Sequence, residues 1–219
     1  MRGVVEAVVF DMDGVLVDSE EFWDAAREQV ALEAGGTWGE QAQRDMMGMS
    51  SLEWSRYMRE ELGVEQSPEQ INDEVVARME RLYRERLPLI PGAREAVARV
   101  ARWRLGVASS ANRQLIELAL ELAEIRELFT TVVSSEEVAN GKPAPDVYLE
   151  AADRLGVPAP ACAAVEDSEN GIRSAHAAGM RVIAIPNRAF PPSAEALAQA
   201  DLVLDSIEKL DSHAVAGEE

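Results

Sequence analysis

The chain of 219 residues has little cysteine, little lysine and no long apolar run. Its one cysteine, Cys162, cannot form an internal disulfide, which agrees with a reducing compartment. No apolar stretch is long enough to span a bilayer, and Glu6 interrupts the short apolar run near the start, so no signal core is present. These absences lead us to expect a soluble cytoplasmic protein.

Positive charge is also scarce. The chain has 21 basic and 40 acidic residues, for a net charge of −19, and only two of the basic residues are lysines, Lys142 and Lys209. Nucleic acid and anionic membranes need a basic surface, so neither is expected as a partner. A small anionic substrate would need local positive charge. We expect a monomer whose partner is a small metabolite.

The apolar pattern after Gly92 is typical of a parallel sheet covered by helices, because extended apolar segments alternate with helical ones. Apolar strands such as 181–185 fit a sheet that is buried on both faces. The tail after Asp211 is expected to fray. The predicted strands are 4–10, 104–109, 131–134, 161–166, 181–185 and 202–204, and the predicted helices are 93–102, 112–123, 145–155, 168–178 and 193–199.

The segment from Ser19 to Arg86 is helical in pattern throughout. Ser19 is a helix cap in this interpretation, and capping boxes begin at Ser50 and Ser67. Such a segment is far too long for one crossover helix. We therefore expect an all-helical cap domain of the four-helix bundle type, residues 18–87, inserted into an α/β core of residues 1–17 and 88–219. Its predicted helices are 19–35, 39–47, 50–62 and 67–86.

Two carboxylates, Asp11 and Asp13, directly follow the first apolar strand. The alternation of extended backbone directs both side chains to one side. Burying two acids together is costly unless a cation meets them, so the pair suggests a metal site or a catalytic pair. On this segment alone, two solvated loop acids remain an alternative.

Other polar residues fall where further strands end. Ser109 and Ser110 end one strand, Glu166 and Asp167 end another, and Lys142 lies in a loop before a helix. Singly, the serine or the acids could cap helices and the lysine could be solvated. Ligands of open parallel sheets bind at the carboxyl ends of the strands, so the residues together favour phosphoryl transfer. Carboxylates would hold Mg²⁺, and the lysine would neutralise phosphate charge.

Four ordered motifs carry a resemblance to a known family. Residues 11–19, Ser109, 141–143 and 166–168 resemble the motifs of the haloacid dehalogenase-like hydrolase superfamily, over essentially the whole chain. The helical insertion resembles the cap of the subgroup that contains β-phosphoglucomutase and sugar phosphatases. Residues 18–20 followed by Trp23 are especially similar to hexose and hexitol phosphate phosphatases. The resemblance implies a doubly wound, Rossmann-like parallel sheet.

The same resemblance implies residue roles. Asp11 would be the nucleophile that forms an aspartyl-phosphate, and Asp13 the general acid and base. Magnesium would be held by the Asp11 carboxylate, the Asp13 main-chain carbonyl and Asp167, with Glu166 close by. The residues expected to bind the phosphoryl group are Ser109, Ser110 and Lys142. Asn112, which opens the following helix, would lie near the substrate or, as its preferred role, cap that helix.

Residues present and missing separate the branches of the family. The dehalogenase branch lacks the counterpart of Asp13, and the phosphonate-cleaving branch needs a cap lysine, which 19–87 does not contain. The β-phosphoglucomutase branch has a histidine where Trp23 stands and an arginine near Ser51, and this chain has neither. Three cap arginines could substitute, but we interpret them as solvated: Arg27, Arg44 and Arg56. A phosphatase is therefore favoured, with the mutase as the alternative.

Substrate specificity is expected at the cap face that meets the core. Trp23 and Trp54 could offer flat faces to a sugar ring, although tryptophan and methionine at helical spacing can equally belong to a helical core. The candidates are Glu20, Trp23, Met49, Ser50, Ser51 and Trp54.

A phospho-receiver switch is the non-enzymatic alternative, since such domains also combine a parallel sheet, acids and a lysine. They have no inserted helical cap and need no counterpart of Asp13. Cys162, inside a predicted strand, is expected to be a core residue. The sequence thus predicts a Mg²⁺-dependent phosphatase of a small phosphorylated metabolite, most simply a sugar phosphate.

Overall fold

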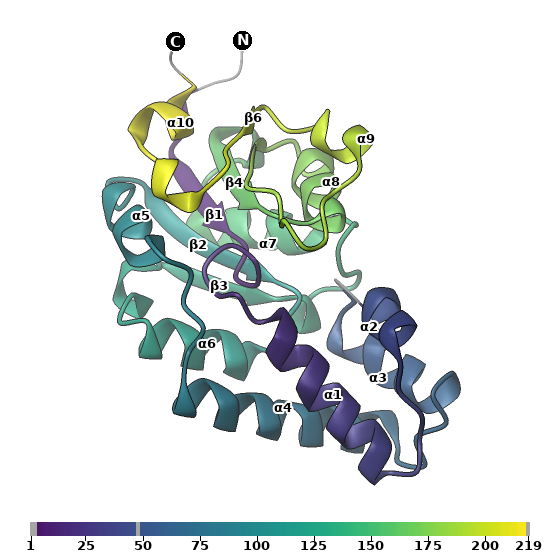
Figure 1. Cartoon of the computed structure of the whole chain (residues 1–219). Coiled ribbons are helices and arrows are strands. Elements are labelled where there is room, and N and C mark those ends of the chain that lie inside the picture. Colours follow the sequence, from purple (N-terminus) through teal and green to yellow (C-terminus); the bar gives the residue numbers. More distant parts are fainter. Residues whose placement is uncertain (1–3, 47–48, 218–219) are drawn as a thin grey trace.

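A computed structural model describes residues 4–46 and 49–217. Its centre is one parallel sheet in the strand order β3-β2-β1-β4-β5-β6, which confirms the predicted doubly wound arrangement (Figure 1). The order in which successive strands are added to the sheet reverses at β1, so the neighbours of β1 are β2 and β4. The strands are β1 (Ala7–Phe10), β2 (Arg104–Ser109), β3 (Thr131–Ser134), β4 (Cys162–Glu166), β5 (Arg181–Ala184) and β6 (Leu202–Val203).

Side chains of β1 alternate between the two faces of the sheet. Val8 and Phe10 join one apolar cluster, while Ala7 and Val9 join the other. Both faces are therefore buried, as the continuous apolar strands predicted. Cys162 is buried in the second cluster, which confirms its expected place in the core.

Helices cover both faces of this sheet (Figure 1). The α-helices are α5 (Ala93–Arg99), α6 (Arg113–Leu122), α7 (Asp146–Leu155), α8 (Glu169–Ala177), α9 (Ala194–Leu197) and α10 (Ser212–Ala216). Single turns of 3₁₀ helix lie at η1 (Arg126–Leu128), η2 (Ser135–Glu137), η3 (Ala159–Ala161) and η4 (Ile207–Lys209). Within the part of the chain that the structure describes, no helix is long and apolar enough to cross a membrane.

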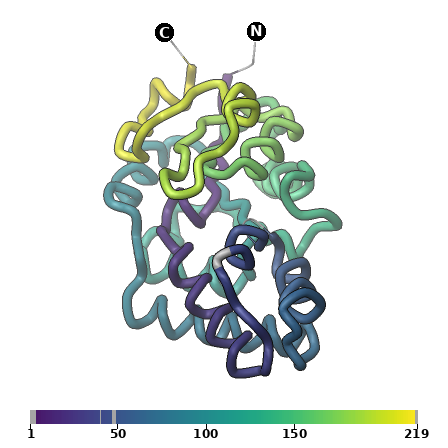
Figure 2. Tube along the Cα trace, turned by 45° about the vertical axis from the view of Figure 1, so that its right-hand side comes forward, coloured from purple at the N-terminus to yellow at the C-terminus, as the bar shows by residue number. Residues whose placement is uncertain are grey.

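Four further helices lie between β1 and α5 in the sequence. They are α1 (Glu20–Glu33), α2 (Glu40–Met46), α3 (Ser51–Glu60) and α4 (Pro68–Glu85). Figures 1 and 2 place α1 to α3 at the end of the molecule opposite α10, and α4 packs against α6. One apolar cluster runs from Phe10 in the sheet through Leu115 on α6 to Met79 on α4. These helices thus share a core with one face of the sheet.

Capping signals located most helix starts. Both predicted capping boxes, at Ser50 and Ser67, are present. Ser19 precedes α1, but its hydroxyl makes no cap hydrogen bond and instead donates to Asp13. Ser19 thus occupies the predicted N-cap position, but the prediction that its side chain caps the helix was wrong, because the hydroxyl forms a hydrogen bond with Asp13 instead.

Several predicted ends and one whole element differ from the structure. β1 begins at Ala7 and not at Val4, whose side chain is 84% exposed. The predicted end of the second cap helix, Met47, lies outside the described residues. The fraying expected after Asp211 was wrong, since α10 forms there. The Asp211 side chain caps α10, and Val215 packs into the core.

Candidate active site

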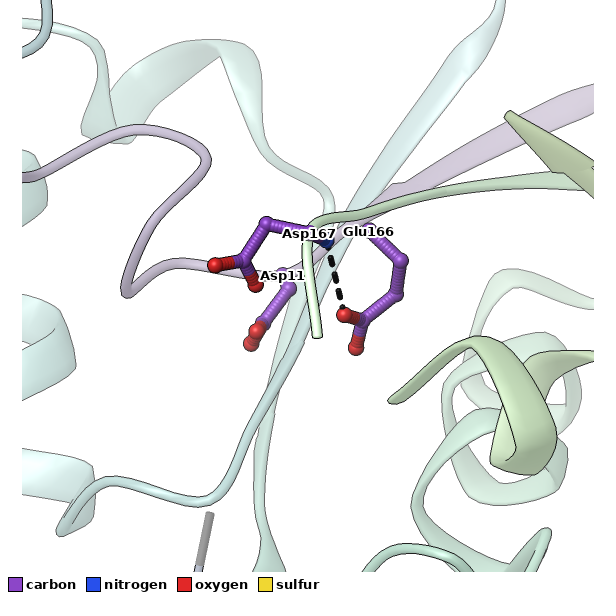
Figure 3. Close-up of side chains that lie close together, drawn as sticks. All are labelled: Asp11, Glu166 and Asp167. Carbon is purple, nitrogen blue, oxygen red and sulfur yellow. Dashed lines mark hydrogen bonds between the residues drawn. The ribbon is translucent and has the colours of Figure 1, made fainter. Parts of the chain in front are cut away.

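Three carboxylates meet where β1 and β4 end. Phe10 pairs with Val165 in the parallel register, so Asp11 follows one strand beside the Glu166 and Asp167 that end the other. One carboxylate oxygen from each of the three acids lies within 4.8 Å of the others, and all three residues are buried. Figure 3 shows the three carboxyl groups gathered at this edge. We call the tendency of ligands to bind at the carboxyl ends of parallel strands the strand-end rule, and the cluster lies where this rule predicts it. It joins residues 155 positions apart in the sequence (166 − 11).

Lys142 is the cation of this cluster. Its Nζ lies 3.0 Å from Asp11 Oδ1 and 2.6 Å from Glu166 Oε1, and the residue is buried. These contacts exclude the alternative that Lys142 is a solvated loop lysine. Tyr148, which the sequence did not indicate, donates its hydroxyl to Glu166 Oε1 at 2.8 Å. Lys142 also lies 5.0 Å from the centre of the Tyr148 ring.

The cluster holds more negative than positive charge. Burial raises the pKa of Asp11 to about 8 against the opposing charge of Lys142, and it raises the pKa of Asp167 well above its usual range. Three buried carboxyl groups face one lysine, so a further cation would favour their ionised forms. Carboxylate oxygens are the donors that hard divalent cations prefer. These residues therefore fit a metal such as Mg²⁺.

Two glycines leave room for the carboxyl groups of Asp167 and Glu166. A Cβ on Gly14 would lie 1.9 Å from Asp167 Oδ2, and one on Gly171 would lie 1.8 Å from Glu166 Oε1. Gly14 also has a φ of +78°, which side-chain-bearing residues rarely adopt. Both glycines therefore belong to the site, although only Gly14 lies in a motif that sequence reasoning had singled out.

Asp13 is held apart from the acidic cluster. Its Oδ1 accepts hydrogen bonds from Ser19 Oγ and, at 3.2 Å, from Trp23 Nε1. Burial raises the pKa of Asp13, and the hydrogen bonds from Ser19 and Trp23 oppose that effect. The two aspartates thus have different surroundings: Asp11 contacts a lysine and other acids, whereas Asp13 contacts neutral donors.

A cavity of about 420 Å³ connects the two aspartates with α1 and α3. Four of the six cap candidates line it, and the other two, Ser50 and Ser51, line a neighbouring cavity of about 830 Å³. Ser51 Oγ there donates to Glu136 at 2.9 Å. The described residues lining the first cavity are Asp11, Asp13, Glu20, Trp23, Arg27, Met49, Trp54, Ser110, Ala111, Lys142, Asp167, Ser168, Glu169, Asn170, Asn187, Phe190, Pro191 and Pro192.

The end of β2 differs in detail from the expectation. Ser109 is fully buried and its Oγ accepts from the Ala111 amide at 3.0 Å, so Ser110 and Ala111, not Ser109, line the cavity. Asn112 occupies the N-cap position of α6, yet its side chain makes no cap hydrogen bond. It donates instead to Asn72 at 3.0 Å and Glu136 at 2.6 Å, so the predicted capping role was wrong.

Sequence reasoning missed Arg27 and Asn187. Arg27 was expected to be solvated, but it is 8% exposed, and its guanidinium lies against the rings of Trp23 and Trp54. Asn187 follows β5 at the same sheet edge, and its Nδ2 lies 3.4 Å from Asp167 Oδ2. The strand-end rule could have found Asn187. No local pattern distinguishes Arg27 from other helix arginines.

A doubly wound parallel sheet with an acidic cluster and a lysine at the ends of its central strands is the arrangement expected of a haloacid dehalogenase-like enzyme. Residues 8–185 match the family described as haloacid dehalogenase-like hydrolase, and the chain belongs to this family. It is therefore a hydrolase and not a phospho-receiver switch.

Two of the similar proteins are named as phosphatases of hexitols or of phosphorylated carbohydrates. Hexitol phosphatase B of Escherichia coli K12 is 35% identical over 82% of this chain and 83% of its own. The phosphorylated carbohydrates phosphatase of Thermotoga maritima is 34% identical over 82% and 84%. A crystal structure of CbbY from Rhodobacter sphaeroides, a variant in complex with xylulose-(1,5)bisphosphate, superposes with a TM-score of 0.87 at 29% identity, covering 96% of this chain and 99% of that one.

Proposed function

We propose that this protein is a Mg²⁺-dependent phosphatase that hydrolyses a small sugar phosphate through an aspartyl-phosphate on Asp11. The observation that carries the proposal is the pairing of two unlike aspartates in one cavity. Asp11 lies 3.0 Å from Lys142, and Asp13 is held by Ser19 and Trp23. The names of the relatives, a hexitol phosphatase and a phosphorylated carbohydrates phosphatase, support the substrate class.

In the first half of the reaction, a carboxylate oxygen of Asp11 attacks the phosphorus of the substrate. The bond from phosphorus to the sugar oxygen breaks, and Asp13 donates its proton to that oxygen. The raised pKa of Asp13 supports this role, because a carboxyl group must carry a proton before it can act as an acid. The products of this step are the free sugar and phosphorylated Asp11.

In the second half, Asp13 is a carboxylate and removes a proton from water. The water oxygen attacks phosphorus, the bond from phosphorus to the Asp11 oxygen breaks, and phosphate leaves. Both aspartates return to their starting forms. A dehalogenase would have no use for Asp13, since it protonates no ester oxygen.

The remaining site residues stabilise phosphate charge in this proposal. Lys142 and Ser110, which line the cavity, bind the phosphoryl oxygens together with nearby amides, and Ser109 positions the Ala111 amide from behind them. The Asp11 carboxylate, the Asp13 main-chain carbonyl and Asp167 hold Mg²⁺, with Glu166 beside them. Bound Mg²⁺ supplies electrostatic stabilisation of the transferring phosphoryl group.

Residues 18–87 form the specificity cap of this proposal, and residues 1–17 with 88–219 form the catalytic core. Closure at the hinges near 17–19 and 87–91 would exclude water from the cavity. Four candidates, Glu20, Trp23, Met49 and Trp54, line the cavity, which supports their contact with substrate. Ser50 and Ser51 are one cavity away, so any influence of theirs on specificity would be indirect.

The experiment is a hydrolysis screen of sugar phosphates and p-nitrophenyl phosphate, with Mg²⁺ or EDTA, on wild type and Asp11→Asn. Asp153→Asn is the matched control, because Asp153 is exposed on α7 and does not line the cavity. We expect Mg²⁺-dependent phosphate release by wild type and Asp153→Asn and none by Asp11→Asn. Isomerisation of β-glucose 1-phosphate without phosphate release would instead establish the mutase.

A further inference from the structure

Arg27 is a buried cation on the wall of the cavity that contains Asp11 and Asp13. Its guanidinium carbon lies 4.8 Å from the centre of the Trp23 ring and 5.0 Å from that of Trp54. Both rings contact the guanidinium through cation–π interactions. Such contacts stabilise the charge but accept none of the N–H hydrogen bonds that lie in the guanidinium plane.

Arg27 Nε is buried without a hydrogen-bond partner among residues 4–46 and 49–217. The charges of Glu20, Asp13 and Asp24 favour the charged guanidinium, but within these residues no ion pair joins any of the three acids to it. The other cation of the cavity, Lys142, differs in this respect, since it contacts both Asp11 and Glu166. A buried charged donor without an acceptor is costly, so a ligand that supplies oxygens there would be favoured.

Arg27 makes no hydrogen bond to the reacting groups in the described residues, although the charge of Asp13 favours its charged form. Trp23 contacts Asp13 through its indole N–H, and Arg27 follows Trp23 by one turn of α1. Lys142 contacts Asp11 directly, so the two cations serve different parts of the cavity. A ligand whose phosphoryl group lies at Asp11 and Lys142 would therefore present a different group to Arg27.

We propose that Arg27 binds a second anionic group of the substrate, a phosphate or a carboxylate, at the end remote from the phosphoryl group that is transferred. This inference rests on the proposed phosphatase function and narrows its substrate class to sugar bisphosphates and phosphorylated sugar acids. A planar guanidinium matches two oxygens of such a group at once. With a net charge of −19 on the chain, a dianionic substrate needs such a local cation.

The test compares matched substrates that differ in the second charge. One pair is sorbitol 6-phosphate and 6-phosphogluconate, and the other is fructose 6-phosphate and fructose 1,6-bisphosphate. The value of kcat/KM is measured for wild type, Arg27→Gln, Arg27→Lys and Arg84→Gln. Arg84 is the matched control because it is an exposed arginine on α4.

For wild type we expect a preference of about tenfold or more for the charged member of at least one pair. Arg27→Gln should bring this ratio close to one, Arg27→Lys should retain part of it, and Arg84→Gln should leave it unchanged. Wild-type ratios near one in both pairs would overturn the inference. So would an equal loss by Arg27→Gln on charged and uncharged members, which would place Arg27 at the transferred phosphate.

A binding measurement separates this inference from the proposed function and from misfolding. Calorimetry on Asp11→Asn, with and without Arg27→Gln, gives the Kd of each compound without turnover. Tighter binding of 6-phosphogluconate than of sorbitol 6-phosphate, lost with Arg27→Gln, would support the inference even if wild type hydrolysed neither. Equal affinities in Asp11→Asn would overturn it, even if wild type hydrolysed both and Arg27→Gln did not fold.

Discussion

At the scale of single residues, the proposed mechanism depends on the different surroundings of two aspartates. Sequence motifs located Asp11, Asp13, Lys142, Glu166 and Asp167, because short-range spacing and strand-end position carry that information. The contacts that tune them come from distant positions. Tyr148 reaches Glu166 from α7, which no local pattern indicates. Sequence alone therefore predicts the charged groups better than the neutral residues that hold them.

Replacement of Asp13 by asparagine tests its role as the acid. Because a sugar oxygen needs a proton to leave and p-nitrophenolate does not, Asp13→Asn should lower kcat on sugar phosphates by about 100-fold or more. The loss on p-nitrophenyl phosphate should be at least tenfold smaller. Steady-state kinetics on both esters gives the comparison. Equal losses would assign Asp13 a role other than leaving-group protonation.

The Tyr148 hydroxyl is predicted to stabilise the fold through Glu166. Tyr148→Phe removes a donor from a fully buried carboxylate and should lower the free energy of unfolding by about 1–3 kcal/mol. Tyr57→Phe removes a comparable 2.8 Å hydrogen bond to Asp45 at the surface and should cost much less. Urea denaturation of the three proteins measures the difference. Similar losses for the two variants would contradict the buried role.

At the scale of elements, the order and type of the strands and helices followed from apolar periodicity and capping signals. The predicted bounds of β2 and β3 agree with the structure. α10 was missed, because its stability comes from the Asp211 cap and from burial of Val215 against distant residues. Contacts between elements were not predictable in the same way: Asn112 at the start of α6 was expected to cap its own helix, but its side chain contacts Asn72 of α4.

α8 provides a test of packing against helix propensity. Alanine is a better helix former than glycine, so Gly171→Ala would stabilise an isolated helix by about 1 kcal/mol. In this protein its Cβ would meet the Glu166 carboxylate, so we expect a net loss of stability and weaker Mg²⁺ binding. Gly39→Ala is the control, since no described atom lies within 4 Å of its added Cβ. Thermal melts with a Mg²⁺ titration measure both the stability and the metal binding of the variants. A Gly171→Ala variant more stable than wild type would show that the Glu166 carboxyl group can move aside without cost.

At the scale of the whole molecule, the fold brings the carboxyl ends of β1, β2 and β4 and the loop before α7 to one edge of the sheet. The parallel topology was predictable, and it placed the acidic cluster correctly. The residues that line the cavity were harder to predict, since Phe190 and Arg27 join it only through the packing of segments distant in sequence. The net charge of −19 also leaves the whole molecule with an excess of negative charge, which favours binding of a cation.

Metal binding should therefore stabilise the entire fold. Bound Mg²⁺ would relieve repulsion among Asp11, Glu166 and Asp167, and a ligand at 100 times its Kd adds about 2.7 kcal/mol to the stability. We expect Tm to rise with Mg²⁺ relative to EDTA at equal ionic strength. Asp167→Asn should lose most of this rise, while Asp205→Asn, which removes an exposed acid, should keep it. Equal responses in the two variants would indicate general screening instead of a site.

The most direct test of the central claim is chemical trapping of the phosphorylated enzyme. Wild type is mixed with Mg²⁺ and a sugar phosphate that it is known from the screen to hydrolyse. The mixture is quenched, reduced with borohydride and analysed by peptide mass spectrometry. Reduction of an aspartyl-phosphate leaves homoserine, so the account predicts homoserine at position 11, dependent on substrate and absent from Asp13 and Asp167. Turnover with no modification at Asp11, or with modification at another acid, would contradict the account.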